Sequence, residues 1–354
     1  MSLLSLSRNE LKELLSDQPK YRIDQIWKGV YEQHLRPSEI TTLPKQLREQ
    51  LGQDPRFNLQ GEEVEVLQAD GGKTIKTLTR FSDGREVESV LMRYESRVTL
   101  CVSSQAGCAM GCVFCATGQA GFFRHLSADE ILEQVFLAAR RAKDLYDSRL
   151  SNLVFMGMGE PLANYDNVIE AVAKINFEFS IAARHITVST VGIVPGILKL
   201  AENPMQISLA VSLHAANDEL RTRLVPINAR YPLDDLVASL DAYRERSNRR
   251  ISFEWAMMAD INDHDSDAFE LAEIAKRVKA HVNLIPLNPT PLFPTPGTEL
   301  DRVYEFRDLL VDSGVNATVR MTRGNQIAAA CGQLSTQVKV RRSSRGEDKD
   351  LQAT

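Results

Sequence analysis

The sequence predicts an α/β protein whose main body is a partial (β/α)6 barrel, preceded by a small helical domain and antiparallel lead-in strands. From about residue 94 onward, apolar runs alternate with amphipathic helical stretches in about six strand–helix units. Such alternation is typical of parallel strands joined by right-handed crossovers. Because about six units are too few to close an eight-stranded barrel, we expect an open barrel with its site at the carboxyl ends of the strands.

Two short regions precede the barrel. Residues 1–60 hold three stretches with helical apolar spacing, separated by proline and polar turns: LLSLSRNELKELL, IDQIWKGVYEQHL and LPKQLREQL. Residues 61–93 alternate apolar and polar side chains in VEVLQA, KTIKTLTRF and EVESVLMRY, with turn sequences DGGK and SDGRE between them. We therefore expect helices in the first region and antiparallel strands in the second, with RVTLCVSS belonging to either the lead-in or the barrel.

The barrel region, residues 94–335, alternates regularly. Ser127 and Glu130 match a capping box that begins the helix ADEILEQVFLAARRAK. The strands that follow are SNLVFMG, HITVST, QISLAVSL, RISFEWAMM, HVNLIPL and NATVRMT. The helices between them are DNVIEAVAKI, a short one from Pro195, PLDDLVASLDAYRER, DAFELAEIAKRVK and LDRVYEFRDLLVDSG. Residues 336–354 are basic and polar, which predicts a disordered tail.

Composition favours a cytoplasmic protein. Five cysteines are too few, and an odd number, for a disulfide framework. Charges at Arg8, Glu10 and Lys12 interrupt the start of the chain, so we expect neither a signal peptide nor a membrane span. The net charge of -5 does not favour nucleic-acid binding. Basic residues do cluster from Lys20 to Arg48 and in the tail at Lys339, Arg341, Arg342 and Arg345, and on charge alone an RNA-binding face and a solvated surface are equally good interpretations.

Three cysteines are spaced C-x3-C-x2-C in the stretch CVSSQAGCAMGCVFCATGQ, at Cys108, Cys112 and Cys115. A structural zinc ion needs a fourth ligand, and the only near candidate, His125, stands at an unusual spacing. A [4Fe-4S] cluster held by three cysteines instead leaves one iron open for a further ligand, which is a catalytic arrangement.

This cysteine motif resembles that of the radical SAM superfamily. Together with YRIDQIWKGVYEQ, seven segments in order resemble the RlmN family of adenine carbon-2 RNA methyltransferases: LCVSSQAGCAMGCVFCATG, FMGMGEPL, TVSTVGIVP, AVSLHA, LVPIN, NLIPLNPTP and TRGNQIAAACGQL. The resemblance covers residues 10 to 335. It implies the partial radical SAM barrel and, as cofactors, a [4Fe-4S] cluster and two S-adenosylmethionine molecules per turnover.

The resemblance also implies roles for the remaining cysteines. Cys331 would accept a methyl group from the first S-adenosylmethionine. Cleavage of the second would give a 5′-deoxyadenosyl radical that takes a hydrogen atom from this methyl group, and the carbon would then add to carbon 2 of adenine. Cys101 would resolve the adduct by forming a transient disulfide with Cys331. The low reduction potential of such clusters implies an external electron donor such as a flavodoxin.

Further residues match the family at single positions. Glu88 matches a proton acceptor, although taken alone it would more often be an outward carboxylate on a strand. The remaining matches are cofactor contacts, at Gly159, Glu160, Ser189, Ser212, Leu213, His214 and Asn288. A histidine at a strand end is otherwise more often structural. One departure is Ala328, where many relatives carry an acidic residue, so any carboxylate role at that position is in doubt.

The resemblance implies methylation of adenosine 2503 in 23S rRNA and of adenosine 37 in tRNA by a monomeric enzyme, with the helical domain of residues 1–60 gripping the RNA. One alternative is a Cfr-type methyltransferase that acts on carbon 8 of the same rRNA adenosine. An alternative of a different class is a non-catalytic iron–sulfur or zinc protein that binds RNA or transfers electrons, which gives Cys101 and Cys331 no role.

Overall fold

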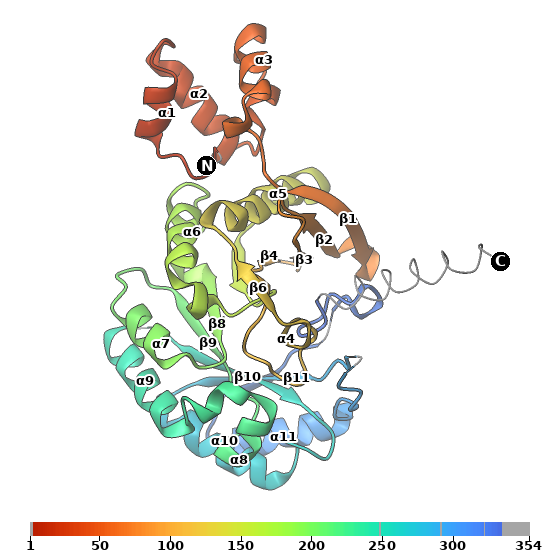
Figure 1. Cartoon of the computed structure of the whole chain (residues 1–354). Coiled ribbons are helices and arrows are strands. Elements are labelled where there is room, and N and C mark those ends of the chain that lie inside the picture. The colour runs from red at the N-terminus through yellow and green to blue at the C-terminus, as the bar shows by residue number, and fades with distance from the viewer. Residues whose placement is uncertain (1–2, 248, 291, 322, 335–354) are drawn as a thin grey trace, which may run out of the picture.

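A ten-stranded sheet organises the molecule (Figure 1), which is a computed structural model that describes residues 3–247, 249–290, 292–321 and 323–334. At one side of the sheet, four consecutive strands pair antiparallel: β1 (Glu62–Ala69), β2 (Thr74–Arg80), β3 (Glu86–Arg93) and β4 (Val98–Cys101). From β4 onward all pairing is parallel, through β7 (Asn152–Phe155), β8 (Ile186–Thr190), β9 (Ser208–Ser212), β10 (Ile251–Met257), β11 (His281–Pro286) and β12 (Ala317–Val319). The lead-in strands and the barrel therefore form one sheet, with β4 belonging to both.

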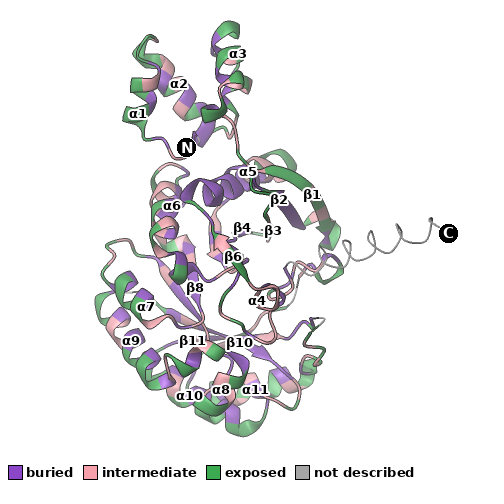
Figure 2. Cartoon of the chain, in the orientation of Figure 1, coloured by how far each residue is buried: buried purple, intermediate pink, exposed green. Residues whose placement is uncertain are grey.

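Helices on the outer side of the sheet connect its parallel strands. They are α5 (Ala128–Tyr146), α6 (Tyr165–Phe177), α7 (Val194–Ala201), α9 (Leu233–Arg246), α10 (Asp265–Val278) and α11 (Leu300–Asp312). Figure 2 shows these helices buried where they face the strands and exposed on the opposite side. The predicted partial barrel of six strand–helix units is confirmed, as is the capping box of α5, in which Ser127 and Glu130 bond each other's backbone N–H.

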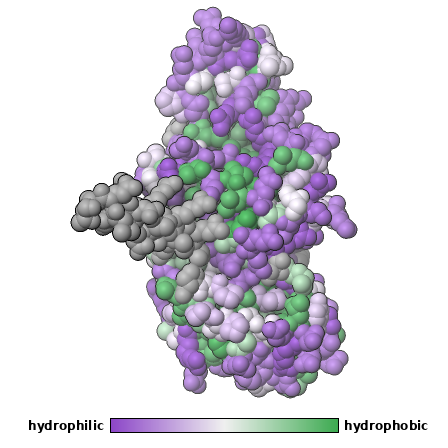
Figure 3. Space-filling view, turned by 90° about the vertical axis from the view of Figure 1, so that its right-hand side faces the viewer, coloured by the Kyte–Doolittle hydropathy of each residue, from purple (hydrophilic) through white to green (hydrophobic). Residues whose placement is uncertain are grey.

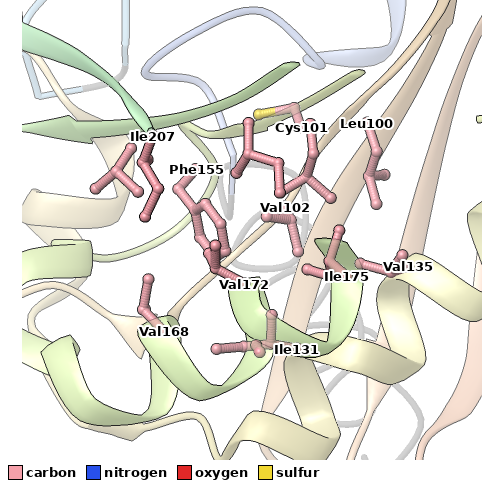
Figure 4. Packing of buried hydrophobic residues seen from close by; sticks show 14 of the residues in the cluster. Leu100, Cys101, Val102, Ile131, Val135, Phe155, Val168, Val172, Ile175 and Ile207 are labelled. Atoms are coloured by element: carbon pink, nitrogen blue, oxygen red, sulfur yellow. The ribbon is translucent and has the colours of Figure 1, made fainter. Parts of the chain in front are cut away.

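Apolar side chains from α5, α6 and the strands fill the space beneath the sheet. Figure 4 shows Ile131 of α5 and Val172 of α6 packed toward Phe155 of β7 and Val102, all of them almost completely buried. The sulfur of Cys101 points away from this cluster. Because successive side chains of a strand alternate between its faces, the apolar neighbours of Cys101 anchor β4 while its thiol is presented to the barrel interior.

Several short elements are not indicated by the spacing of apolar residues in the sequence. They are α8 (Asp218–Leu224), α4 (Ala116–Ala120), the hairpin of β5 (Gln105–Gly107) with β6 (Phe122–His125), and 3-10 turns at Asp70–Gly72, Pro161–Asn164, Ala183–His185, Pro226–Ala229 and Asn325–Ile327. Elements of three to seven residues carry too few turns of a helix or steps of a strand to show a period. Several of them build the site described below.

The N-terminal helices pack directly on the barrel. They are α1 (Arg8–Leu14), α2 (Lys20–Tyr31) and α3 (Lys45–Gln53), with 3-10 turns at Pro37–Glu39 and Pro55–Phe57. Trp27 donates its indole N–H to Glu178 just beyond α6 at 2.7 Å, and Arg140 of α5 pairs with Glu39 at 2.7 Å. Their apolar side chains belong to the same buried cluster as the barrel core. The outer surface of these helices, at the top of Figure 3, is mostly hydrophilic.

No helix in the described ranges is long and apolar enough to cross a membrane. The predicted basic tail, including Lys339, Arg341, Arg342 and Arg345, lies outside the described residues.

A buried carboxyl joins the helical region to the barrel. Glu133 of α5 is fully buried and accepts the backbone N–H groups of Gln60 (2.7 Å) and Gly61 (2.8 Å), where the chain leaves the helices and approaches β1. Burial raises the pKa of Glu133 to about 7, against the opposing effect of the two N–H groups.

The stability of the fold should therefore respond to the protonation of Glu133. The unfolded chain loses this proton near pH 4.5, whereas the folded chain keeps it until about pH 7. Between these values the folded state binds more protons, so the Glu133 contribution to the free energy of unfolding falls by up to about 3 kcal/mol as pH rises. Glu133→Gln cannot titrate at this position. Urea unfolding should therefore show that the free energy of unfolding of the variant, relative to that of the parent, is higher at pH 8 than at pH 5. The exposed Asp144→Asn on the same helix is the control. A difference between Glu133→Gln and parent that stays constant with pH would contradict this assignment.

Candidate active site

An open cavity lies at the carboxyl ends of the barrel strands. It is lined by residues that follow β7, β8, β9 and β11 and by the loop between β5 and β6. The predicted site residues that line it are Cys108, Cys112, Cys115, Gly159, Glu160, Ser189, Ser212, His214, Asn288 and Cys331. We refer to it below as the first cavity. Its position agrees with the rule that sites of β/α barrels form at this end of the strands.

The loop of three cysteines is fixed at both ends. Gly107 has a φ of 75°, and a Cβ at this position would stand 2.0 Å from the carbonyl oxygen of Gly121, so the strands of the β5–β6 hairpin approach as only glycine allows. The Cys108 N–H donates to that carbonyl at 2.9 Å. Cys115 is the N-cap of α4, and the N–H of Val113 donates to Leu224 at the end of α8 at 3.1 Å. The loop is therefore held by the barrel on two sides.

The three thiols fit a multinuclear centre better than a single ion. Among the described residues, no group of three His, Cys, Asp or Glu side chains lies close enough to share one metal ion. A cubane cluster places each cysteine on a different iron, so its ligands need not converge on one point. The candidate fourth zinc ligand, His125, is absent from the cavity lining and instead bonds Gln105 at 3.0 Å. Burial raises the pKa of Cys108 to about 12, so bound iron would be needed to stabilise its thiolate.

Gly159 and Glu160 follow β7 as predicted. Gly159 has a φ of 102°, and a Cβ there would stand 2.5 Å from the side chain of Gln105. The carboxylate of Glu160 is buried and accepts the N–H groups of Leu162 (3.0 Å) and Val191 (2.9 Å), while burial raises its pKa to about 7. A buried, oriented carboxyl at the edge of the cavity can receive a ligand ammonium group through charge-assisted hydrogen bonds.

His214 is held as a neutral imidazole with a defined tautomer. Its Nδ1 accepts the backbone N–H of Ala256 at 3.0 Å, which requires its own proton to sit on Nε2. Burial, aided by the charge of Arg221, lowers its pKa to about 3. Its backbone carbonyl is bound by Asn262 at 2.8 Å, and Phe114 of the cysteine loop packs edge-on against its ring. His214 therefore presents one N–H donor toward the first cavity.

The other predicted cofactor contacts divide into two groups. Ser189, Ser212 and Asn288 line the first cavity at the ends of β8, β9 and β11. Leu213 does not line the cavity, because its side chain is completely buried. Its N–H donates to the backbone carbonyl of Glu254 at 3.1 Å, and its own carbonyl accepts from the guanidinium of Arg221 at 3.1 Å. Among the described contacts, Leu213 supports the position of His214 rather than the cavity wall.

A second cavity adjoins the first and is lined by both Cys101 and Cys331. Met156, Asn288 and Cys331 line both cavities. Cys101 is buried, and burial together with the nearby Cys331 raises its pKa to about 12, against the opposing charge of Arg320. The two thiols that the resemblance pairs, 230 residues apart in sequence, therefore share one cavity that the three-cysteine loop does not line.

The loop that carries Cys331 is attached to three different elements. Gly332 accepts the N–H of Ala116 in α4 at 2.7 Å, next to Cys115. Ala328, which has a φ of 48°, accepts the ammonium of Lys76 in β2 at 3.2 Å. Asp70, which precedes β2, accepts the N–H of Gly324 at 3.1 Å. At Ala328 it is thus the backbone carbonyl that makes the contact.

Glu88 is an interior residue and lines neither cavity. It is buried on β3 and forms an ion pair with the equally buried Lys76 at 2.9 Å. The interpretation of Glu88 as an outward carboxylate is therefore wrong. Val90 and Met92, which share its face of the strand by alternation, line the second cavity, so Glu88 lies one step beyond the wall of that cavity.

Sequence reasoning missed Lys76 and Arg320. Lys76 gave no clear signal, because the apolar residues of KTIKTLTRF fall on both faces of the strand, Ile75 on one and Leu78 on the other. Arg320 lines the second cavity, and the charge of Cys331 is the largest of the influences that raise its pKa. Its position after the short strand β12 gave no clear signal either.

The chain is similar to known proteins over nearly its whole length. Residues 102–272 match the family model described as the radical SAM superfamily. A protein of Dictyoglomus thermophilum named "Probable dual-specificity RNA methyltransferase RlmN" is 42% identical, with 94% of this chain and 96% of that protein covered. A "Ribosomal RNA large subunit methyltransferase N" of Nitrosopumilus maritimus is 44% identical, with 95% and 99% covered.

One solved structure agrees in fold as well as sequence. The crystal structure of a radical SAM methyltransferase from Sphaerobacter thermophilus is 45% identical, covers 95% of this chain and 99% of its own, and superposes with a TM-score of 0.90. With these relatives, and with the barrel and cysteine loop described above, the chain belongs to the RlmN family of radical SAM methyltransferases.

Proposed function

We propose that this protein methylates carbon 2 of an adenosine in RNA, at position 2503 of 23S rRNA and at position 37 of tRNA, through a methyl group carried on Cys331. The observation that carries the proposal is the position of Cys331, which lines both the cavity of the three-cysteine loop and the cavity of Cys101. A thiol at this junction can take up a methyl group on one side and deliver it on the other. The names of the relatives support RNA as the substrate.

The first cavity supports the cofactors of a radical SAM protein. Cys108, Cys112 and Cys115 would hold the [4Fe-4S] cluster, and Glu160 would receive the ammonium group of S-adenosylmethionine. The remaining contacts would come from Gly159, Ser189, Ser212, His214 and Asn288, and Leu213 would hold His214 in place behind them. When bound, these cofactors supply the one-electron chemistry that an unactivated adenine carbon requires, from two S-adenosylmethionine molecules per turnover and an external donor such as a flavodoxin.

The second cavity supports release of the product. When the carbon on the Cys331 sulfur is bonded to adenine, enzyme and RNA are covalently joined. The Cys101 thiolate then attacks the Cys331 sulfur, so that an S–S bond forms as the C–S bond breaks. The electron pair of the broken bond stays with the carbon, which takes up a proton and becomes the methyl group. Before this attack the radical adduct would have to lose one electron, which would return to the cluster. It would also lose the proton of the adenine carbon, which Cys101 would take and pass to Glu88.

Several accompanying proposals follow from the family. The enzyme acts as a monomer in the cytoplasm, where reduced thiols and both RNAs are present. Its target adenosine leaves its stacked position to reach Cys331 and the buried Cys101, at a cost of a few kcal/mol. The helical region of residues 1–60 assists in holding the RNA.

The methylated product distinguishes this function from its competitors. Purified, reduced enzyme with S-adenosylmethionine and either 23S rRNA or tRNA should yield 2-methyladenosine, measured by mass spectrometry of the digested RNA. Replacing Cys108 by alanine removes a cluster ligand and should abolish the product. If 8-methyladenosine formed in place of 2-methyladenosine, the carbon-2 assignment would be wrong. A fully loaded enzyme that methylated neither RNA would contradict the catalytic proposal.

Removing the resolving thiol should trap the intermediate. In Cys101→Ala, the bond between Cys331 and RNA can form but has no thiolate to break it, so a protein–RNA adduct should accumulate and turnover should fall by at least about a hundredfold. The adduct is detected on denaturing gels and by mass spectrometry of the Cys331 peptide. The matched variant Cys331→Ala should form no adduct. Adduct-free turnover by Cys101→Ala would exclude the proposed role of this thiol.

A further inference from the structure

Three arginines and two tyrosines form a connected group near the turn between β3 and β4. The guanidinium carbons of Arg97 and Arg323 lie 4.4 Å and 4.3 Å from the ring centre of Tyr94. The guanidinium of Arg93 lies 5.0 Å from the ring centre of Tyr146, at the end of α5. Arg323 also donates to the backbone carbonyl of Arg93 at 2.9 Å, which joins the two stacks. We call these five residues the arginine–tyrosine ladder.

The ladder is built on fixed supports. The β3–β4 turn is closed by the N–H of Tyr94, which donates to the carbonyl of Arg97 at 2.8 Å. Tyr146 donates its hydroxyl to Gly72 at 2.5 Å. Arg323 stands 226 residues further along the chain than Arg97, in the loop that leads to Cys331. The fold therefore brings positive charge from two distant segments to one place.

This place is the rim of the second cavity. Tyr94 and Arg323 line that cavity together with Cys101, Cys331 and Arg320. Arg93 and Arg97 are exposed beside them. The ladder therefore lies beside the cavity that the two thiols share.

The charges of the ladder are available for a ligand. Within the described part of the chain, no carboxylate lies within 4.0 Å of the guanidinium groups of Arg93, Arg97 or Arg323. Glu95, in the same turn, is exposed. The net charge of -5 does not cancel this local positive charge, because salt screens charge interactions beyond about 10 Å.

We propose that the arginine–tyrosine ladder binds backbone phosphates of the RNA next to the target nucleotide. This inference rests on the proposed function and adds to it the surface that receives the substrate. A guanidinium group that stacks on a ring keeps the N–H groups at its edge free, and these match phosphate oxygens. Because two guanidinium groups already engage the ring of Tyr94, that ring is not the platform for a base. The ladder thus holds the strand without reading its sequence.

The salt dependence of RNA binding tests the ladder. Affinity of an RNA hairpin with the target adenosine in its loop is measured by fluorescence anisotropy over a series of salt concentrations. Arg97→Ala and Arg323→Ala should each weaken binding and reduce the slope of log K against log salt by about 1. Arg307→Ala removes the same charge from a stack on Tyr304, 4.8 Å from its ring centre, on the outer helix α11, and should leave affinity and slope unchanged.

Further measurements distinguish failure of the ladder assignment from failure of the proposed function. Methylation of Cys331 without RNA should proceed in Arg97→Ala, because Arg97 lines neither cavity. Arg97→Gln repeats the test if the alanine variant unfolds. Exchange of the target adenosine for guanosine should leave the ratio of parent to variant affinity unchanged. Slopes equal to the parent in both ladder variants, or a ratio that depends on the base, would overturn the ladder assignment. Failure of the parent enzyme to bind or methylate RNA would instead overturn the proposed function.

Discussion

One thiol has to face two cavities, and the position of Cys331 at their junction is the constraint on which the rest of the site depends. A cysteine in a loop can hold such a position only if the loop is fixed from several directions. Here the backbone around Cys331 is bound by Ala116, beside the three-cysteine loop, and by Lys76 of β2. The left-handed conformation of Ala328 costs about 1 kcal/mol or more, and the Lys76 contact helps to offset it.

Several buried polar groups behind the site have partners within the protein. Lys76 and Glu88 are both buried and pair at 2.9 Å, a combination that costs desolvation and becomes strongly unfavourable if either partner is lost. Glu160 and His214 are likewise buried with their backbone partners in place. Groups held in this way need little rearrangement when a ligand arrives, which is the arrangement that favours catalysis by preorganised charge.

The sequence predicted the barrel well because its period is long and regular. Six strand–helix units and the capping box at Ser127 are all present as expected. The three-cysteine loop and most of the residues predicted to contact cofactors line one cavity, because they lie directly after predicted strands. The pairing of Cys101 with Cys331 was predicted only through the resemblance, since nothing in local sequence relates residues so far apart, and the structure adds that both line one cavity.

Other features needed the three-dimensional arrangement. The antiparallel strands continue the barrel sheet because β4 pairs with β3 on one side and β7 on the other. Pairing of Lys76 with Glu88, and of Arg323 with the turn at Tyr94, depends on the register between distant segments. Short elements such as α8 and the β5–β6 hairpin show no local sequence pattern. Their conformation depends on their contacts with the barrel, so it could not be predicted from sequence.

The central claim is that the methyl carbon of the product passes through Cys331. It is tested most directly by loading Cys331 with a deuterated methyl group, removing the free S-adenosylmethionine, and running a single turnover with unlabelled S-adenosylmethionine. Mass spectrometry of the RNA should then find deuterium in the methyl group of the first methyladenosine formed. A first product with no deuterium would show that the methyl group reaches RNA without Cys331 and would contradict the account.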